Sequence, residues 1–123
     1  MNKHILSKAF FGKDNCLRVY LNTKKECFFE FGFPRGGGKN WSWKAVKFSD
    51  VELGELIAIL EGVKDSTSFF HSYNGGKTQI WVRKNKESFF IRLKDLSKGL
   101  NIGEQVVLRE LLSHIIIISN SYF

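Results

Sequence analysis

The sequence has few of the residues that build metal sites or disulfide frameworks. Its 123 residues include 2 cysteines, 3 histidines and 1 proline. Cys16 and Cys27 lack metal-type spacing. A chain of this length buries roughly two-thirds of its unfolded surface, so it needs no disulfide to fold. We therefore predict two small interior or edge cysteines in a reducing compartment, and neither a metal nor another cofactor.

Long apolar runs are also absent. The most apolar stretch, 111–118, contains Ser113 and His114 and is far shorter than the roughly 20 residues of a membrane span. Near the start, Lys8 and Lys13 interrupt the apolar run before it reaches the length of a signal peptide. The expected location is the cytoplasm, with the nucleoid as the site of association if the protein is bacterial, and no membrane partner is expected.

Arrangements typical of catalysis are missing too. His4, His71 and His114 have no recognisable partners in the sequence, and no Ser/His/Asp or Cys/His spacing stands out. Most acidic residues fall at capping and solvent positions of the expected helices, which disfavours a carboxylate pair for acid/base work. The sequence therefore predicts that the protein is not an enzyme.

Positive charge and aromatic residues, in contrast, are abundant. The chain has 19 Lys and Arg against 12 Asp and Glu, a net charge of +7 and a pI near 9.5. This excess favours a polyanionic partner, nucleic acid before an anionic membrane surface. Aromatic residues make up 15% of the chain, including 12 Phe, and a core of this size can hold only some of them. The others are expected at the surface.

An internal repeat organises the rest of the chain. Residues 17–32 (LRVYLNTKKECFFEFG) match residues 78–93 (TQIWVRKNKESFFIRL) without a gap. Each copy has two runs rich in β-branched and aromatic residues around a short polar turn, which predicts a β-hairpin. The matched positions include Val19 and Ile80, Tyr20 and Trp81, Leu21 and Val82, and Phe28-Phe29 and Phe89-Phe90.

Alternation of side chains along a strand divides each hairpin into two faces. The aliphatic face of the outbound strands holds Val19, Leu21, Ile80 and Val82. The opposite face holds Arg18, Tyr20, Asn22, Gln79, Trp81 and Arg83. With two-residue turns, the returning strands add Phe28 and Phe89 to the aliphatic face, and Phe29, Phe31, Phe90 and Arg92 to the aromatic and cationic one. A one-residue slip or bulge exchanges these returning sets.

Further strands and a helix complete each copy. Phe-Phe pairs ahead of Gly- and Asn-rich turns predict strands at 7–11 and 66–73. The hairpins are followed by a connection at 34–40 and a strand at 41–48 in the first copy, and by a connection at about 94–99 and a strand at 100–102 in the second. Ser49 and Glu52 form a capping box for one helix, Gly62 ends it, and a second helix starts near 101–104.

One such unit buries only part of one sheet face, so two units are expected to share a core. The predicted fold class is α+β, with two β-β-β-β-α repeats, about 5–63 and 64–118, as halves of a single domain, 1–123.

This order of features resembles the PUR repeat of the purine-rich-element-binding proteins. The resemblance rests on Tyr20-Leu21, a Lys-containing turn, Phe28-Phe29, a Gly-Gly-Gly-Lys-Asn connection, and a strand ending in Lys47-Phe48-Ser49 before a helix rich in Leu and Glu. It covers about 7–117 and implies a minimal, single-domain, bacterial-type member with an intertwined, whirly-like fold. Such proteins bind single-stranded DNA and RNA, often purine-rich, and act in transcriptional or translational control. The second repeat lacks the Gly-rich connection, which leaves open whether both halves bind equally.

The candidate nucleic-acid-binding residues form three groups. The aromatic and cationic face contributes Arg18, Tyr20, Phe29, Phe31, Trp81, Arg83, Phe90 and Arg92. The two hairpin turns contribute Lys24, Lys25, Lys84, Asn85 and Lys86. The Gly-rich connection and the strand after it contribute Arg35, Lys39, Trp41, Trp43 and Lys47. Aromatic rings of this kind stack on unpaired bases while Lys and Arg contact phosphate. For the aromatic face the alternative is packing under the other repeat or at a subunit interface. For the connection it is an ordinary hairpin loop with Trp43 packed at its base, and for the turns it is plain solvation.

Two function classes remain open. The first is a regulator that binds single-stranded DNA or RNA. The second is a protein–protein adaptor that uses the same aromatic face and the Ile-rich segment 115–118. This segment is expected to be buried either against the other half or in a homodimer. Salt dependence separates the classes, because phosphate contacts weaken steeply with ionic strength and an aromatic protein interface does not.

Overall fold

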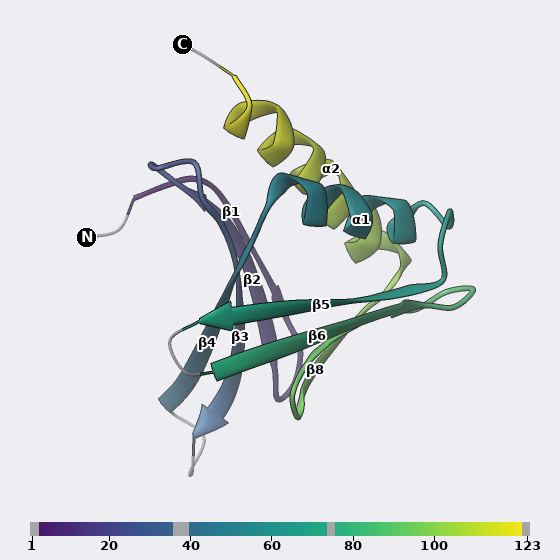
Figure 1. Ribbon diagram of the computed structural model, residues 1–123. Coiled ribbons are helices and arrows are strands. Elements are labelled where there is room, and N and C mark those ends of the chain that lie inside the picture. Colours follow the sequence, from purple (N-terminus) through teal and green to yellow (C-terminus); the bar gives the residue numbers. More distant parts are fainter. Residues whose placement is uncertain (1–2, 36–39, 74–75, 122–123) are drawn as a thin grey trace.

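The computed structural model describes residues 3–35, 40–73 and 76–121. This part of the chain forms two antiparallel four-stranded sheets, each followed by a helix (Figure 1). In chain order the elements are β1 (His4–Phe11), β2 (Cys16–Asn22), β3 (Cys27–Arg35), β4 (Asn40–Phe48), α1 (Asp50–Leu60), β5 (Ser66–Tyr73), β6 (Gly76–Lys84), β7 (Phe89–Leu93), β8 (Leu96–Leu100) and α2 (Ile102–Ser119). Strand order in each sheet follows the chain. The α+β class and the repeated β-β-β-β-α order are therefore confirmed.

Both helices begin at capping boxes. Ser49 Oγ accepts a hydrogen bond from the Glu52 amide at 3.2 Å, and Glu52 Oε1 accepts one from the Ser49 amide at 2.9 Å. Asn101 and Glu104 make the same exchange at the start of α2. After α1, Gly62 takes the left-handed φ of 81° that a glycine tolerates best. Local sequence therefore sets where the helices start and where α1 stops.

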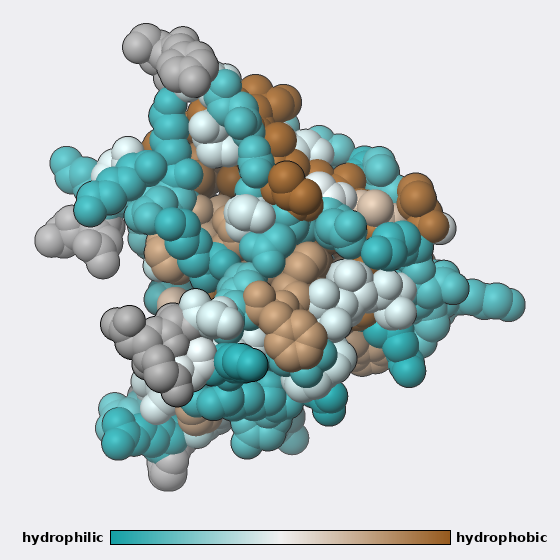
Figure 2. Space-filling view, viewed as in Figure 1, coloured by the Kyte–Doolittle hydropathy of each residue, from teal (hydrophilic) through white to brown (hydrophobic). Residues whose placement is uncertain are grey.

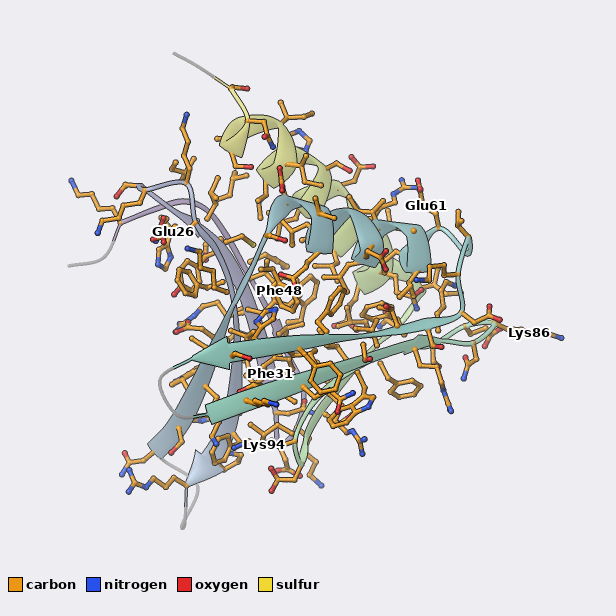
Figure 3. All side chains as sticks on the ribbon, in the orientation of Figure 1. Glu26, Phe31, Phe48, Glu61, Lys86 and Lys94 are labelled. Carbon is orange, nitrogen blue, oxygen red and sulfur yellow. The ribbon has the colours of Figure 1, made fainter. Side chains whose placement is uncertain are left out.

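The core lies between the inner faces of the two sheets and is closed by the helices. Phe48 of β4 packs edge-on against Phe29 at 4.6 Å and against Phe69 of β5 at 5.5 Å, which joins the two halves. Phe31 and Phe48 lie in this interior in Figure 3. The helices pack side by side at one end (Figure 1); α1 contacts β5 and β6, while α2 contacts β1 and β8. Each helix thus reaches the sheet of the other half.

The register of the first hairpin differs from the second and corrects the expected position of two phenylalanines. In the second hairpin Lys84 pairs with Phe89, and the Asn85 amide bonds the Ser88 carbonyl around a two-residue turn, so Phe89 is buried as expected. In the first, Leu21 pairs with Cys27, and the Asn22 amide bonds the Glu26 carbonyl around a three-residue loop. Because the loop has three residues instead of the expected two, each side chain of the returning strand points to the opposite face of the sheet from the one predicted. Phe29 and Phe31 are therefore core residues, 0% and 2% exposed, and Phe28 faces outward.

The last strand of the second half starts earlier than expected. Leu93 pairs with Leu96, so β8 follows a two-residue turn at Lys94 and Asp95 instead of the predicted connection at 94–99. Lys94 takes a φ of 55°, a left-handed conformation that glycine adopts most readily. The sequence does not predict this turn, because neither Lys94 nor Asp95 is a glycine.

The Ile-rich end of α2 is divided between core and solvent. Ile115 is fully buried, and Ile116 and Ile118 pack against the core, whereas Ile117 is 64% exposed. Burial within the chain therefore accounts for most of this segment. Neither helix in the described part of the chain has the combination of length and hydropathy that a membrane span requires.

Both cysteines are buried free thiols. Burial raises the pKa of the Cys27 thiol to about 12. Burial also raises the pKa of Cys16, against the opposing effect of the nearby Arg18 and Lys98 charges. The two thiols are therefore protonated at neutral pH and have little nucleophilic character.

Candidate nucleic-acid interface

The face of the first sheet that points away from the core carries a band of aromatic rings. Strand pairing places Tyr20 opposite Phe28, Gly32 opposite Trp43, and Pro34 opposite Trp41 on this face. His4, Tyr20 and Phe28 form one row, with ring centroids 4.0 and 5.5 Å apart along it. Trp41 and Trp43 form another, 6.2 Å apart. These rings offer π-faces at a surface that contributes nothing to the core.

Arg18 of β2 lies on the same face and already has an acidic partner. Its Nε and Nη2 both lie 2.7 Å from Glu30 Oε1, and its guanidinium sits 4.3 Å from the centre of the Trp43 ring. Lys47 on the same face is paired with Glu26 at 2.9 Å. These pairs offset part of the positive charge, so aromatic rings dominate the chemistry of this face.

Tyr20 adds no negative charge to this surface. Burial, and then the nearby Glu30 carboxylate, raise the pKa of its phenol above the ordinary value. The hydrogen bond from Lys47, with help from Asn22, lowers the pKa of Glu26. Tyr20 is therefore a neutral ring at physiological pH, whereas Glu26 stays ionised beside its lysine.

Gly32 permits the position of the Trp43 indole. A Cβ at Gly32 would lie 2.6 Å from Cζ3 and 2.8 Å from Cε3 of Trp43, closer than side chains pack. The ring therefore rests directly on the glycine backbone. In this position it also lies beneath the Arg18 guanidinium.

Replacing Gly32 with alanine is expected to push the indole off the sheet and to lower the free energy of unfolding by about 1–3 kcal/mol. Tryptophan emission should shift to longer wavelength as the ring becomes more solvated. The matched control is Gly54→Ala on α1, where an added methyl meets nothing within 4 Å. That change should raise stability by about 0.5–1 kcal/mol through helix propensity. Unchanged emission from the Gly32 variant would contradict the contact.

The outer face of the second sheet alternates rings and cations. Trp81 pairs with Arg92, and Arg83 with Phe90, so each aromatic residue lies opposite an arginine. The Arg92 guanidinium sits 4.5 Å from the centre of the Trp81 ring. Neither arginine makes an ion pair with a described residue. A shallow hollow of about 660 Å³ lies over these four side chains, and no described acidic residue lines it.

Phe29 and Phe31 cannot take part in either face, because both are buried in the core. Phe28, which sequence reasoning assigned to the core, takes their place on the outer face. The signal that could have found it is the length of the loop at 23–25, since three residues between paired strand ends reverse the faces.

The lysine-rich turns project from the ends of the hairpins. Lys86 stands at the tip of the β6–β7 turn in Figure 3, beside the exposed Asn85 and near the half-buried Lys84. In the β2–β3 turn Lys24 is exposed. Lys25, in contrast, takes a φ of 63°, and its Nζ donates a 2.6 Å hydrogen bond to the Ser121 carbonyl. Lys25 therefore holds Ser121, just after α2, against the first hairpin.

The Gly-rich connection contributes only its flanks to the described structure. Arg35 is exposed at the end of β3, and Trp41 is half-buried near the start of β4. Lys39 lies outside the described residues. Within residues 3–35, 40–73 and 76–121, no three His, Cys, Asp or Glu side chains group closely enough to hold a metal ion.

No protein-family model matches this chain, and no curated protein matches its sequence. Among solved structures, it is similar to MRP1/MRP2 of Trypanosoma brucei, with a TM-score of 0.71 and 12% sequence identity. The match covers 94% of this chain and 94% of that chain. At this identity the likeness concerns the fold alone. The chain therefore shares the arrangement of MRP1/MRP2 along nearly its whole length.

Proposed function

We propose that the protein binds single-stranded DNA or RNA on the outer faces of its sheets. The observation that carries the proposal is the second sheet, where Trp81 and Phe90 alternate with Arg83 and Arg92 and no described acidic residue lines the surface. Stacking of a base on an aromatic ring contributes about 1–3 kcal/mol and works for every base. Arginines without acidic partners remain available for phosphate.

The aromatic rows of the first sheet support the same function. Tyr20, Phe28, Trp41 and Trp43 present rings to solvent side by side. The net charge of +7 favours the approach of a polyanion. The first face would contribute stacking, and the second face both stacking and phosphate contacts.

A finer assignment, to a PUR-type domain of whirly-like fold, is part of the proposal. The repeated β-β-β-β-α order and the helices that reach across the halves support it. A preference for purine-rich sequence and a regulatory role rest on the PUR resemblance. Within this proposal the protein is not an enzyme and acts in the cytoplasm or at the nucleoid.

The test of this function is strandedness. A single-stranded oligonucleotide should bind much more tightly than its duplex, whose bases are already stacked on one another. Fluorescence anisotropy with labelled single-stranded and duplex forms of one purine-rich sequence measures the difference. A pyrimidine-rich strand tests base preference, and two salt concentrations separate phosphate contacts from stacking. Equal affinity for both forms would exclude stacking and leave only charge attraction.

Exposed apolar residues on the helices support a second candidate function, contact with another protein. Hydrophobic residues gather over the helical end of the molecule in Figure 2. They include Val51, Ile102, Val106, Val107 and Ile117, each more than a third exposed. This surface could serve a homodimer or an adaptor without involving the sheets. Molecular mass in solution, measured by light scattering over a range of protein concentrations, tests self-association.

A further inference from the structure

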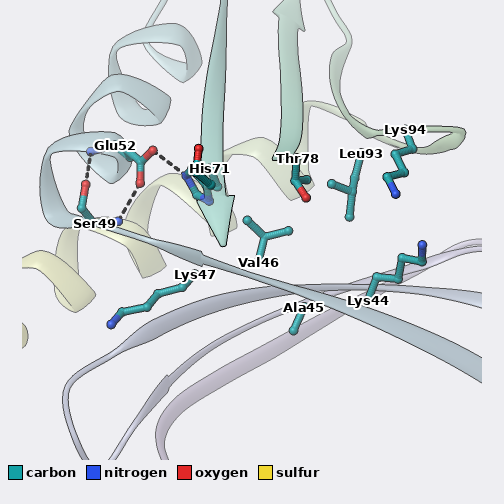
Figure 4. Close-up of a pocket in the computed structure, with 11 residues that line it drawn as sticks. Lys44, Ala45, Val46, Lys47, Ser49, Glu52, His71, Thr78, Leu93 and Lys94 are labelled. Atoms are coloured by element: carbon teal, nitrogen blue, oxygen red, sulfur yellow. Dashed lines mark hydrogen bonds and ion pairs between the residues drawn. The ribbon is translucent and has the colours of Figure 1, made fainter. Parts of the chain in front are cut away.

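A cleft of about 570 Å³ opens where the two halves meet (Figure 4). Its walls come from β4, the start of α1, β5, β6 and the β7–β8 turn. Val46 and Leu93 give it apolar surface, and Thr78 and His71 add polar groups. None of the three tryptophans lines it. The volume falls within the range of small-molecule sites in proteins.

Lys44 occupies an unusual position beside this cleft. On β4, Phe48, Val46 and Lys44 pair with Cys27, Phe29 and Phe31, so the lysine continues the row that faces the core. A charged group at such a position costs free energy unless its head reaches water or an anion. Lys44 is exposed, and its ammonium points into the cleft in Figure 4.

Lys94 faces Lys44 from the opposite wall. It is the first residue of the β7–β8 turn and takes a φ of 55°, which a glycine would adopt without strain. The two ammonium groups point toward one another in Figure 4, and neither lysine has an ion pair with a described residue. Two like charges that converge in this way favour an anion between them.

The remaining charged groups of the cleft are already engaged. Glu52 Oε2 lies 2.7 Å from His71 Nε2, and Glu52 Oε1 accepts a hydrogen bond of 2.9 Å from the Ser49 amide. Lys47 is bound to Glu26 and turns away from the cleft in Figure 4. One end of the cleft therefore holds a pair formed by His71 and Glu52, and the other holds two lysines without acidic partners.

We propose that this cleft binds a nucleotide that carries a phosphate monoester, with the phosphate between Lys44 and Lys94 and the base against Val46 and Leu93. A phosphate monoester carries a charge of about −1.5 to −2 at pH 7, which matches two ammonium groups, whereas a backbone diester carries a single charge. The ligand can be a free nucleoside monophosphate or the 5′-phosphorylated end of a strand. Binding of a strand end rests on the proposed function, whereas binding of a free nucleoside monophosphate does not.

Calorimetric titration with adenosine 5′-monophosphate tests the site. Lys44→Gln and Lys94→Gly should each weaken binding by about tenfold or more, the effect of losing one charge-assisted contact. Lys94→Gly also relieves the left-handed strain, so its melting temperature should not fall. Lys13→Gln is the matched control, since it removes one charge from an exposed turn outside the cleft. It should bind the nucleotide as the parent does.

The two sources are distinguished with one oligonucleotide in 5′-phosphorylated and 5′-hydroxyl forms. If the strand end is the ligand, the phosphorylated form binds more tightly and Lys94→Gly removes the difference. Tryptophan quenching reports the outer faces separately, so it persists in this variant if the proposed function holds. The inference is overturned if both lysine variants retain nucleotide binding. It is also overturned if neither the monophosphate nor the terminal phosphate shows any binding that depends on Lys94.

Discussion

Replacing both Trp43 and Trp81 with alanine should weaken single-strand binding by about 2–6 kcal/mol, because each change removes a stacking surface worth about 1–3 kcal/mol. The two indoles are 36% and 37% exposed and lie on different sheets, so the fold should survive. Anisotropy of a labelled strand at constant salt measures the loss, and circular dichroism checks folding.

The single variants show how the two halves divide the affinity. Trp43 and Trp81 lie on separate faces, so their effects should add if one strand contacts both. Val63→Ala is the control, since Val63 is 75% exposed in the turn between α1 and β5. A double variant that binds within about threefold of the parent would show that the indoles are not stacking platforms.

Replacing Phe29 with alanine should lower the free energy of unfolding by about 3–5 kcal/mol, because a fully buried ring leaves a cavity. The neighbouring Phe28→Ala should cost only about 0.5–1.5 kcal/mol, the value of an aromatic pair, since Phe28 stacks on Tyr20 at the outer face. Urea denaturation of the two variants measures both costs.

This pair of adjacent residues tests the register directly. The two-residue turn expected from sequence would reverse the result, with Phe28 the costly position. Equal losses would mean that neither register describes the hairpin. Binding gives an independent readout, since Phe28→Ala should also reduce single-strand affinity while Phe29→Ala acts through stability alone.

Local signals in the sequence were sufficient to predict most of the fold. Ser49 with Glu52, and the residues around Asn101, fixed the helix starts, because capping depends on groups only a few positions apart. The outbound strands were also correct, since alternation places Val19 and Ile80 inward and Tyr20 and Trp81 outward whatever follows.

The faces of the returning strands could not be predicted from the repeat, because the two hairpins have different registers. The ungapped match of the two copies implied equivalent partners, but Val19 pairs with Phe29 while Ile80 pairs with Leu93. The difference arises in the loops, where Lys25 adopts a left-handed φ without being glycine. Hydrophobic residues at both 28 and 29 suited either register, so the pattern could not choose between them.

No local sequence pattern predicts the cleft between the halves, because its walls come from segments far apart in the chain. Lys44 and Lys94 belong to different sheets, and they meet only because β4 and the β7–β8 turn form opposite walls of the same cleft. In the sequence each is one lysine among many. Lys44 is distinguished only by its place on β4, where it follows Phe48 and Val46 on the side that faces the core. That place becomes clear only from the strand pairing.

The contact of each helix with the sheet of the other half is compatible with an origin of the chain by duplication of one β-β-β-β-α unit. Because α1 lies on β5 and β6 of the other half, and α2 divides its sheet contacts between β8 of its own half and β1 of the other, a single β-β-β-β-α unit would lack part of the cover that the whole chain gives its sheet. Two separate copies of that unit could cover one another through the same contacts. Gene duplication and fusion would then need to add only a short link such as 61–65, which joins α1 to β5. The architecture is that of two like units held together in one polypeptide, and the outer surfaces of the two sheets differ although their element order is the same.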